Sequence, residues 1–409
     1  PFFLKCSLKM TEDFCILIHY HEIALKGKNR IWFERRLIKN IKHQLTGIPW
    51  RKVRLAAARI FCFGIDESLW NEYAQRLRKV VGIKHAILMT QVKNDIDKIQ
   101  SVAAIQLKGI EFVSFRVSAR RQYKEYALTS QEVNEQVGQH LQSIYLKPVK
   151  LKNADVDVAI ELVKGMAYIG HKRVHGYGGL PLGTSEKAVS MISSGIDSPV
   201  SSFQMLKRGV DLTYVHFHST PATSRQSIQN VEEILTVLAG YQISCRIYMV
   251  PLLKIQQKIM AEAPNKLWVI LFRRAMIRLA SMIAEHIDAS ALISGESVGQ
   301  VASQTLSNIR ATADAADRPI LRPLAGLNKE DIVRIAEKIG TYEISIEPYD
   351  DCCSFFVPVH PETKADLETV QKTEKSIDFG DMYETALKAA AIRTIEHPDY
   401  IKKPKEILE

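Results

Sequence analysis

The stretch KAVSMISSGIDSPVSSFQMLKR, which runs from Lys187 to Arg208, decides the fold of the larger part of this chain. Its apolar run Ala188–Ile192 predicts a strand, and the small and polar residues Ser193–Ser198 predict a tight loop. Pro199 suits the first turn of a helix, so we expect a strand, a loop and a helix start. The backbone N–H groups of such a loop favour an anion, although an ordinary turn between strand and helix is the alternative.

The loop combines small residues with an acid, and this combination indicates a metal-bound nucleotide. Ser193, Ser194 and Ser198 offer hydroxyl donors, and small residues such as Gly195 let a phosphate approach the backbone. Asp197 cannot bind phosphate directly and is expected to hold Mg²⁺ or to position the loop. The run resembles the pyrophosphatase loop S-G-G-x-D-S of enzymes that split ATP into AMP and pyrophosphate, with Ser194 in place of the first glycine. If that position required a positive φ, serine would cost about 1 kcal/mol.

After the glycine-rich segment GYGGLPLG (Gly176–Gly183), strands and helices alternate as in right-handed βαβ units with a parallel sheet. Ligands of such sheets bind at the carboxyl ends of the strands, near the switch point. The residues that fall at these strand ends are Ile192, His216, Phe217 and Gly295. We therefore expect a nucleotide-base pocket there, beside the loop.

Two arginines, Arg273 and Arg274, lie in an otherwise apolar helix predicted over residues 268–287. An unpaired charge there is costly, so a phosphate partner and a side chain that reaches solvent are the two explanations. Farther on, Asn328 is a helix cap. Lys329, which follows it, is either a second phosphate ligand or an ordinary surface residue of the first helical turn.

The front of the chain carries the positive charge. Residues 1–173 contain 30 Lys and Arg against 16 Asp and Glu, whereas the remainder contains 25 against 29. Such an excess favours a polyanion such as RNA, and a solvated basic face is the alternative. The order of elements in residues 14–81 predicts a ferredoxin-like unit, and residues 82–173 again mix strands with helices. The basic residues considered as RNA ligands are Lys26, Lys28, Arg30, Arg120, Arg121 and Lys124.

The composition is that of a globular protein, and 409 residues are expected to form two or three domains. No apolar run approaches the roughly 18 residues that cross a bilayer, so we expect a cytoplasmic protein with no membrane association. The six cysteines lack the spacing of a zinc site, and neither a structural metal nor a disulfide framework is expected. Only the adjacent pair Cys352 and Cys353 stands out.

The loop, the basic front half and the segment PYDDCCSFF (Pro348–Phe356) together resemble the family of tRNA 4-thiouridine synthetases over nearly the whole chain. The resemblance implies a multidomain α/β protein. Its parts would be a ferredoxin-like domain (residues 1–75), a THUMP RNA-binding domain (76–173), and a doubly wound parallel-sheet ATP pyrophosphatase or PP-loop domain (174–409). In the front motif HYHEIALKGKNR, His19 and His21 stand where the family usually has Arg and Gly.

Matched motif by motif, the resemblance also implies site residues. Asp197 corresponds to the loop acid important for activation, Lys329 to a lysine implicated in adenylation, and Cys352 to the active cysteine. Asp350 and Asp351 would raise the pKa of a neighbouring thiol, so the role of Cys352 stays open, and a buried cysteine is the alternative. The expected ATP ligands are Met191, Ile192, Ser193, Ser194, Gly195, Ser198, His216, Phe217, Arg273, Gly295 and Gln304.

The activity that the resemblance implies is that of a tRNA sulfurtransferase. ATP with Mg²⁺ would adenylate O4 of uridine 8 of tRNA, and sulfur from a persulfide would replace the oxygen. The implied partners are tRNA, a cysteine desulfurase as sulfur donor and the sulfur-carrier protein of thiamine synthesis, and a homodimer is left open. The chain leaves no room for the rhodanese domain of one branch of the family, so it resembles the shorter branch. The alternatives are another THUMP and PP-loop tRNA thiolase, and a tRNA-binding protein without catalytic activity.

Overall fold

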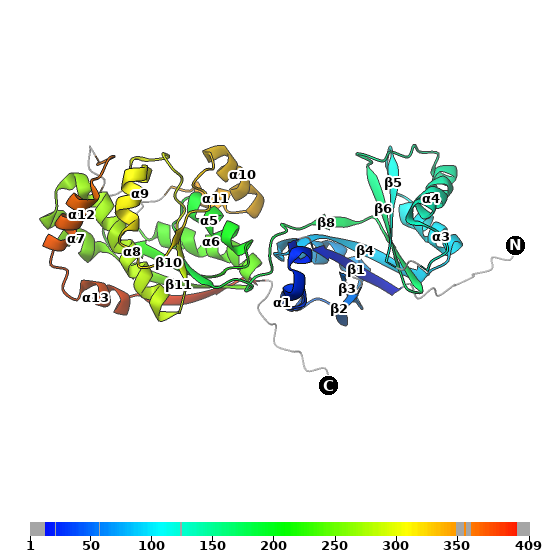
Figure 1. Ribbon diagram of the computed structural model, residues 1–409, viewed down its shortest axis with the longest axis horizontal. Helices are drawn as coiled ribbons and strands as arrows, with labels where there is room; N and C mark the ends of the chain where they lie inside the picture. Colours follow the sequence, from blue (N-terminus) through cyan, green and yellow to red (C-terminus); the bar gives the residue numbers. More distant parts are fainter. Residues whose placement is uncertain are drawn as a thin grey trace, which may run out of the picture. The chain divides into compact units, whose positions relative to one another are not determined.

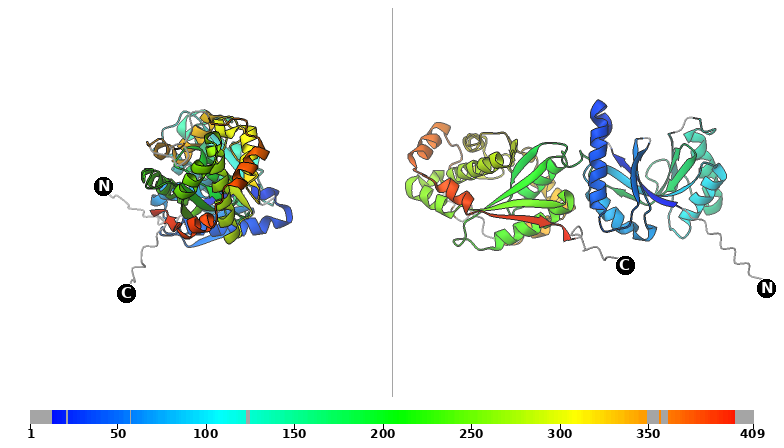
Figure 2. Two further views of the ribbon diagram at one scale, coloured as in Figure 1. Left: turned by 90° about the vertical axis from the view of Figure 1, so that its left-hand side faces the viewer. Right: turned by 90° about the horizontal axis from the view of Figure 1, so that it is seen from below.

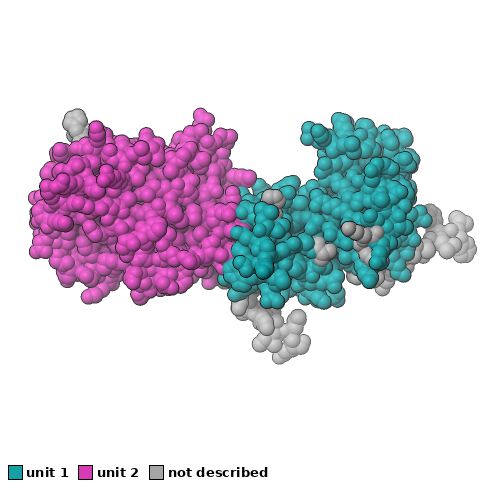
Figure 3. Space-filling view, viewed as in Figure 1, with its two compact units in different colours: residues 1–179 teal, residues 180–409 magenta. Residues whose placement is uncertain are grey.

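The computed structural model describes residues 13–20, 22–56, 58–122, 125–348, 356 and 361–398. The chain forms two compact units, unit 1 with residues 1–179 and unit 2 with residues 180–409 (Figure 3). The division falls inside the glycine-rich segment Gly176–Gly183. The finer domain boundaries at 75/76 and 173/174 stay predictions.

Unit 1 consists of one mixed sheet with helices packed against it (Figure 1). The strand order is β2-β3-β1-β4-β7-β6-β5, and β8 also pairs with β4. Its elements are β1 (Asp13–Tyr20), η1 (Glu22–Leu25), η2 (Gly27–Asn29), α1 (Arg30–Gln44), β2 (Lys52–Ala56), β3 (Arg59–Phe63), η3 (Glu67–Leu69), α2 (Trp70–Lys79), β4 (Ile83–Lys93), α3 (Ile96–Leu107), β5 (Phe115–Arg121), α4 (Ser130–Tyr145), β6 (Val156–Val163), β7 (Met166–Gly170) and β8 (Arg173–His175).

Strand β4 joins the two parts of unit 1, because it pairs with β1 on one side and with β7 on the other. In the first part, β1 to β3 and the helices α1 and α2 have the ferredoxin-like order that the sequence predicts. In the second part, α3 and α4 pack on β5 to β7 around a core that includes Phe115, Val133 and Ile160. Thr129 followed three residues later by Glu132 is a sequence pattern that predicts a capping box. Helix α4 begins at one, in which each of these side chains accepts a hydrogen bond from the other residue's backbone N–H.

Unit 2 is a doubly wound sheet with the strand order β13-β12-β9-β10-β11-β14. All neighbouring strands are parallel except the edge pair β11 and β14. Its elements are β9 (Lys187–Met191), α5 (Asp197–Leu206), β10 (Asp211–His218), α6 (Gln226–Gln242), β11 (Ser244–Pro251), α7 (Leu253–Glu262), η4 (Asn265–Leu267), α8 (Trp268–His286), β12 (Ala291–Ile293), η5 (Ala302–Gln304), α9 (Leu306–Ala313), β13 (Ile320–Leu321), α10 (Lys329–Ile339), α11 (Tyr342–Ser345), α12 (Leu367–Ser376), α13 (Met382–Lys388) and β14 (Ala391–Glu396).

Helices cover both faces of this sheet (Figures 1 and 2). On one face Ser190 of β9 meets Ser202 of α5, their hydroxyls 2.8 Å apart. On the other face Val189 packs into the core formed with α8. The chain runs outward from β9 to β11 and then returns past β9 to β12. The order of the strands therefore reverses between β9 and β12, which is the switch point at which such sheets bind ligands.

Two elements of unit 1 differ from the sequence predictions. The alternation in residues 111–118 predicts a strand that ends before Arg120 and Arg121, but β5 begins at Phe115 and includes both arginines. Strand β4 was not predicted, although it contains the buried apolar run Ala86–Met89. Within the part of the chain that the structure describes, no helix is long and apolar enough to cross a membrane.

Candidate nucleotide-binding site

The loop after β9 is closed by the hydroxyl group of Ser198, in the first turn of α5. This hydroxyl accepts a hydrogen bond from the N–H of Ser193 at 2.8 Å and donates to the carbonyl oxygen of Ser193 at 3.1 Å. Neither Ser194 nor Gly195 has a positive φ, so the strain considered for a serine at position 194 does not arise. Ser194 is buried, and its hydroxyl has no partner among the described residues.

Gly295, just after β12, lies so close to this loop that a side chain would not fit. A Cβ atom on Gly295 would lie 2.8 Å from the backbone nitrogen of Ser198 and 3.0 Å from the carbonyl carbon of Asp197. Real Cβ atoms do not approach backbone atoms this closely. Packing, and not an unusual φ, therefore requires glycine here, and it brings the end of β12 against the N-terminus of α5.

A cavity of about 440 Å³ opens at the switch point. This volume falls in the range of roughly 300–1,000 Å³ that is common for ligand pockets. Of the expected ligands, all but Ser194 line the cavity, and Lys329 reaches it through Asp197. The lining residues are Met191, Ile192, Ser193, Gly195, Asp197, Ser198, His216, Phe217, Val269, Arg273, Met276, Ile277, Ser294, Gly295, Glu296, Val301, Ser303 and Gln304.

Asp197 ties three segments of unit 2 together beside the cavity. One carboxylate oxygen accepts a hydrogen bond from Nζ of Lys329 at 2.7 Å, and the other accepts one from Nε2 of Gln300 at 2.9 Å. Lys329 is the first residue of α10, which Asn328 caps by accepting from the N–H of Asp331. An ammonium group has three donors, so the bond to Asp197 leaves others for a phosphate oxygen.

Arg273 lines the cavity and is held from two sides. Its guanidinium lies 3.1 Å from Oε1 of Glu296 and donates to the hydroxyl of Ser303 at 2.9 Å. The other oxygen of Glu296 accepts from Nε of Arg322 at 2.6 Å. Burial alone would raise the pKa of Glu296, but the two guanidinium groups outweigh burial and lower it. A buried carboxylate therefore stays ionised in the wall of the site.

The neighbouring Arg274 does not line the cavity and forms ion pairs in the core instead. It is only 1% exposed and pairs with Glu374 at 2.6 Å and with Asp314 at 3.1 Å. Arg278 contacts the same Glu374 at 2.7 Å. The explanation that Arg274 reaches solvent is therefore wrong, because its charge is balanced inside the core.

One ring nitrogen of His216, next to the cavity, carries no proton and has no partner among the described residues. Its Nδ1 lies 3.0 Å from the carbonyl oxygen of Ile192, and because a carbonyl can only accept, Nδ1 carries the proton. Burial lowers the pKa of His216 to about 4, so the ring is neutral near pH 7. Its Nε2 is buried without a partner among the described residues, so it can accept a hydrogen bond from a ligand.

Four residues that hold Asp197 or Arg273 in place, directly or through a partner, escaped the sequence reasoning: Glu296, Gln300, Ser303 and Arg322. Glu296 directly follows Gly295 at a predicted strand end, so the strand-end rule could have found it. Gln300 and Ser303 lie in the polar segment before Gln304 and could have been considered with it. Arg322 follows a strand of two residues, which no periodic pattern reveals.

The basic residues considered for RNA binding in unit 1 fall into two groups. Arg30 and Arg121 serve internal contacts: Arg30 donates to Glu34 at 2.7 Å, and Arg121 donates to the carbonyl of Tyr126 at 2.9 Å. The charged groups of the other candidates that the structure describes lie nearer the surface. Lys26 lies over the ring of Phe33, 5.0 Å from its centroid, while Lys28 and Arg120 are exposed, and Lys124 lies outside the described residues.

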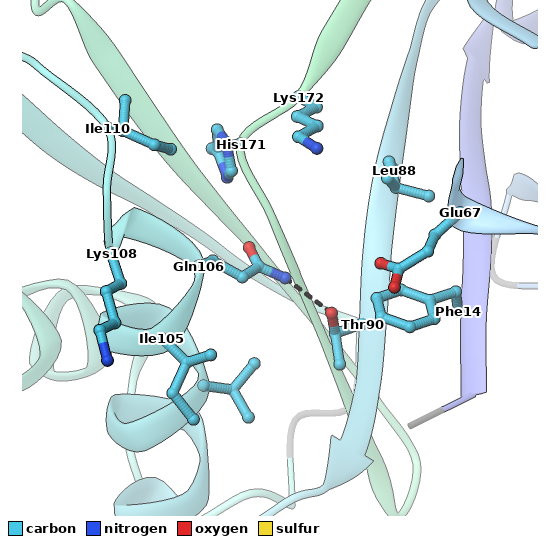
Figure 4. A pocket seen from close by; sticks show the side chains of 11 residues that line it. Phe14, Glu67, Leu88, Thr90, Ile105, Gln106, Lys108, Ile110, His171 and Lys172 are labelled. Atoms are coloured by element: carbon cyan, nitrogen blue, oxygen red, sulfur yellow. Dashed lines mark hydrogen bonds between the residues drawn. The ribbon is translucent and has the colours of Figure 1, made fainter. Parts of the chain in front are cut away.

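A second cavity, of about 370 Å³, lies in unit 1 (Figure 4). Nε2 of Gln106 donates to the hydroxyl of Thr90 at 2.7 Å and to the carbonyl of Ile169 at 2.9 Å, which fixes its amide group. None of the residues proposed for ATP or RNA lines it. The lining residues are Phe14, Glu67, Leu88, Thr90, Val102, Ile105, Gln106, Lys108, Ile110, His171 and Lys172.

The described cysteines are Cys15, Cys62 and Cys245, and all three are buried. Burial raises the pKa of Cys62 to about 12 and that of Cys245 further still. None of the three is therefore suited to act as a thiolate near pH 7. Cys352 and Cys353 lie outside the described residues. Among the residues that the structure does describe, no cluster of His, Cys, Asp and Glu could hold a metal ion by itself.

Comparison with known proteins now adds to this geometry. Family models match three parts of the chain: the ferredoxin-like domain of ThiI at residues 15–86, the THUMP domain at 93–172, and the thiamine biosynthesis protein ThiI at 183–379. A probable tRNA sulfurtransferase from Moorella thermoacetica is 38% identical over 93% of this chain and 97% of its own length. Another from Thermus thermophilus is 37% identical over 95% of both chains.

Among solved structures, a complex of a 4-thiouridine synthetase with RNA and bound ATP resembles this chain with a TM-score of 0.84. The two are 37% identical, and the match covers 94% of this chain and 100% of that one. The fold and the loop thus define a PP-loop protein with ferredoxin-like and THUMP parts. Within that class, the chain belongs to the ThiI family of tRNA sulfurtransferases.

Proposed function

We propose that this protein transfers sulfur to uridine 8 of tRNA in an ATP-dependent reaction that yields 4-thiouridine. One observation supports the proposal above all others. The serine loop, the α5 N-terminus, Arg273 and the Asp197–Lys329 pair converge on one cavity at the switch point, in a chain that is 37% identical to an ATP-bound 4-thiouridine synthetase. Because tRNA is the substrate, we place the reaction in the cytoplasm.

In the proposed site, the triphosphate of ATP lies against the backbone of Ser193–Ser198 and the N-terminus of α5, where the field favours an anion. Arg273 and Lys329 add positive charge. Phe217 and the apolar side chains of α8 on the cavity wall, Val269 among them, suit the base. The unprotonated Nε2 of His216 would accept a hydrogen bond from a donor such as the amino group of adenine.

Mg²⁺ would enter with the triphosphate, whose oxygens supply most of its ligands, since this ion prefers oxygen and keeps several waters. The carboxylate of the loop is Asp197, and both of its oxygens already accept hydrogen bonds. Each oxygen keeps a second lone pair, so Asp197 would contribute to binding the ion, directly or through a water, with these bonds in place. When bound, the ion neutralises phosphate charge.

Activation begins when O4 of the uridine attacks the α-phosphorus of ATP and pyrophosphate leaves. This step turns a poor leaving oxygen into AMP. Positioning and electrostatic stabilisation supply most of the rate, and Lys329 and Arg273 are placed to offset the developing negative charge. Asp197 holds Lys329 in place for this role, at 2.7 Å.

Sulfur then attacks C4 and AMP leaves. We propose Cys352 as the residue that carries the sulfur as a persulfide received from a cysteine desulfurase, and a second thiol then cleaves the remaining S–S bond. The three described cysteines are buried, two of them with a raised thiol pKa, which supports a site elsewhere in the chain. By the same chemistry the protein would thiolate the sulfur-carrier protein of thiamine synthesis.

Unit 1 would bind the tRNA. The excess of Lys and Arg in residues 1–173 supports this role, because phosphate contacts supply much of the affinity for RNA. Of the residues considered for RNA binding, Lys28 and Arg120 are exposed and would meet phosphates, and Lys26 lies two residues before Lys28. Arg30 and Arg121 would act by holding the surrounding loops.

The test is sulfur transfer from radiolabelled cysteine to unmodified tRNA in the presence of a desulfurase and ATP. We expect label in tRNA with the wild-type protein and little with Asp197→Ala or Cys352→Ser. Lys364→Ala, a change in unit 2 outside the cavity, serves as a control and should behave as wild type. Label that is independent of ATP, or undiminished in both site variants, would refute the proposal.

A further inference from the structure

We propose that Glu296 is a positioning residue that holds Arg273 in its nucleotide-binding orientation, with Arg322 as the anchor of Glu296. The inference rests on the proposed function, since it takes ATP to be the ligand of the cavity. It adds two residues, Glu296 and Arg322, to the machinery of that site. Glu296 follows Gly295 just after β12 and Arg322 follows β13, and neither was among the ligands expected from the sequence.

A series of contacts connects Arg322, through Glu296, to Arg273 at the cavity. Arg322 donates through Nε to one oxygen of Glu296 at 2.6 Å, and the other oxygen faces the guanidinium of Arg273 at 3.1 Å. Ser303 holds a second edge of the same guanidinium at 2.9 Å. The side chain of Glu296 is 6% exposed and that of Arg273 is 22% exposed, and both line the cavity, whereas Arg322 does not. A guanidinium fixed on two edges has little freedom left to lose when a ligand binds.

The balance of charge points to an anionic ligand. Two guanidinium groups share one carboxylate, so the cluster keeps an excess of one positive charge in a largely buried wall. Such an excess is costly unless an anion completes it. The phosphate groups of ATP are the anion that the proposed function supplies, and Arg273 lines the cavity in which they would lie.

The chain contains a matched control for this arrangement. Glu374 is buried like Glu296 and is also shared by two arginines, Arg274 and Arg278. Arg273 and Arg274 are consecutive residues of α8, yet Arg274 and Glu374 do not line the cavity. A change at Glu374 therefore disturbs a similar buried pair without touching the site.

The experiment measures the Kd for ATP by calorimetry and the KM and kcat for ATP in sulfur transfer, together with the midpoint of thermal unfolding. For Glu296→Gln we expect an ATP affinity about 10-fold weaker and a KM raised to match, because the neutral amide no longer holds Arg273 as an ion pair. For Glu374→Gln we expect a lower unfolding midpoint but an ATP affinity within about twofold of wild type.

A third variant, Ser303→Ala, leaves every charge in place and removes the hydroxyl that accepts a hydrogen bond from Arg273. It therefore tests whether the positioning of Arg273 governs ATP binding, even if Glu296→Gln fails to fold. We expect about threefold weaker ATP binding and an unchanged unfolding midpoint. Wild-type affinity in both Glu296→Gln and Ser303→Ala would overturn the inference, and so would equal losses in Glu296→Gln and Glu374→Gln. A wild-type protein that does not bind ATP would instead refute the proposed function.

Discussion

Two buried glutamates, one in each unit, show opposite electrostatic behaviour. Glu296 in unit 2 meets two guanidinium groups at 2.6 and 3.1 Å, and its pKa is lowered. Glu161 in unit 1 is equally buried, but His19 and Arg59 approach it only to 3.6 Å, and burial raises its pKa. Burial is the same in both places, so the close partners decide the charge. Glu296 is therefore a fixed charge in the wall of its cavity, whereas Glu161 is only loosely paired.

The strongest test of this contrast is Asp197→Asn, which removes the charge of another closely paired carboxylate of unit 2. Lys329 then loses its 2.7 Å ion pair, and we expect sulfur transfer to tRNA to fall at least about 100-fold. The affinity for tRNA, measured by filter binding, should stay within about twofold, because we assign that role to unit 1. Equal losses of activity and tRNA affinity would contradict the division of roles.

The second test is stability. Glu374→Gln breaks the pairs with Arg274 and Arg278 and should cost unit 2 about 3 kcal/mol, because it leaves a guanidinium buried with too little negative charge. Hydrogen exchange read by mass spectrometry separates the two units, and protection in unit 1 should not change. Glu368→Gln on the same helix removes only an exposed pair with Lys372 and is the control. A cost as small as that of the control would contradict the account.

The third test is pH, and it concerns unit 1. His19 stacks on His85 with ring centroids 4.4 Å apart, and burial first, then the charge of His85 and nearby arginines, lowers the pKa of His19 to about 2. An unfolded histidine has a pKa of 6.5, so the unfolded chain binds this proton first as the pH falls. The contribution of His19 to the free energy of unfolding of unit 1 should therefore decrease below pH 6.5, by about 2 kcal/mol at pH 5, and His85, whose pKa burial lowers to about 3, contributes in the same direction.

Replacing His19 tests the origin of that pH dependence. In urea titrations followed by hydrogen exchange, His19→Asn should reduce the decrease between pH 7 and pH 5 by about 2 kcal/mol, the part due to His19, whereas His43→Asn, a change at an exposed histidine of unit 1, should leave it as in wild type. A wild-type slope in His19→Asn would show that other groups cause the acid sensitivity.

The smallest effect is expected for Glu161→Gln. Its partners lie at 3.5 to 3.6 Å and its pKa is already raised, so neutralising it costs unit 1 less than about 1 kcal/mol. The same substitution at Glu296 should cost more. Urea denaturation of the two variants side by side is the measurement, and a reversed order would mean that contact distance does not govern these carboxylates.

Much of unit 2 was predictable because local patterns and the global fold agree there. The run DLTYVHFH predicts a strand over Asp211–His218, and β10 has these limits. Asn328 caps α10 as expected. The loop stands out because small residues, an acid and a helix start follow a buried strand. Strand ends then indicate where ligands bind, since a parallel sheet gathers them at one edge.

What escaped prediction depends on contacts between distant residues. The pair of Asp197 and Lys329 spans 132 positions, and no spacing rule joins them. Arg273 and Arg274 are adjacent and chemically identical, yet one lines the cavity and the other is buried in the core. Only packing distinguishes them. Strand β4 was missed because its role, to pair with both parts of unit 1, is visible only in the assembled sheet.

The central claim is that ATP binds at the switch point of unit 2, and a crystal structure with a non-hydrolysable ATP analogue tests it most directly. The account predicts phosphate density against Ser193–Ser198 and the α5 N-terminus, with the guanidinium of Arg273 still held by Glu296. An empty loop, with the nucleotide bound anywhere else on the protein, would contradict it.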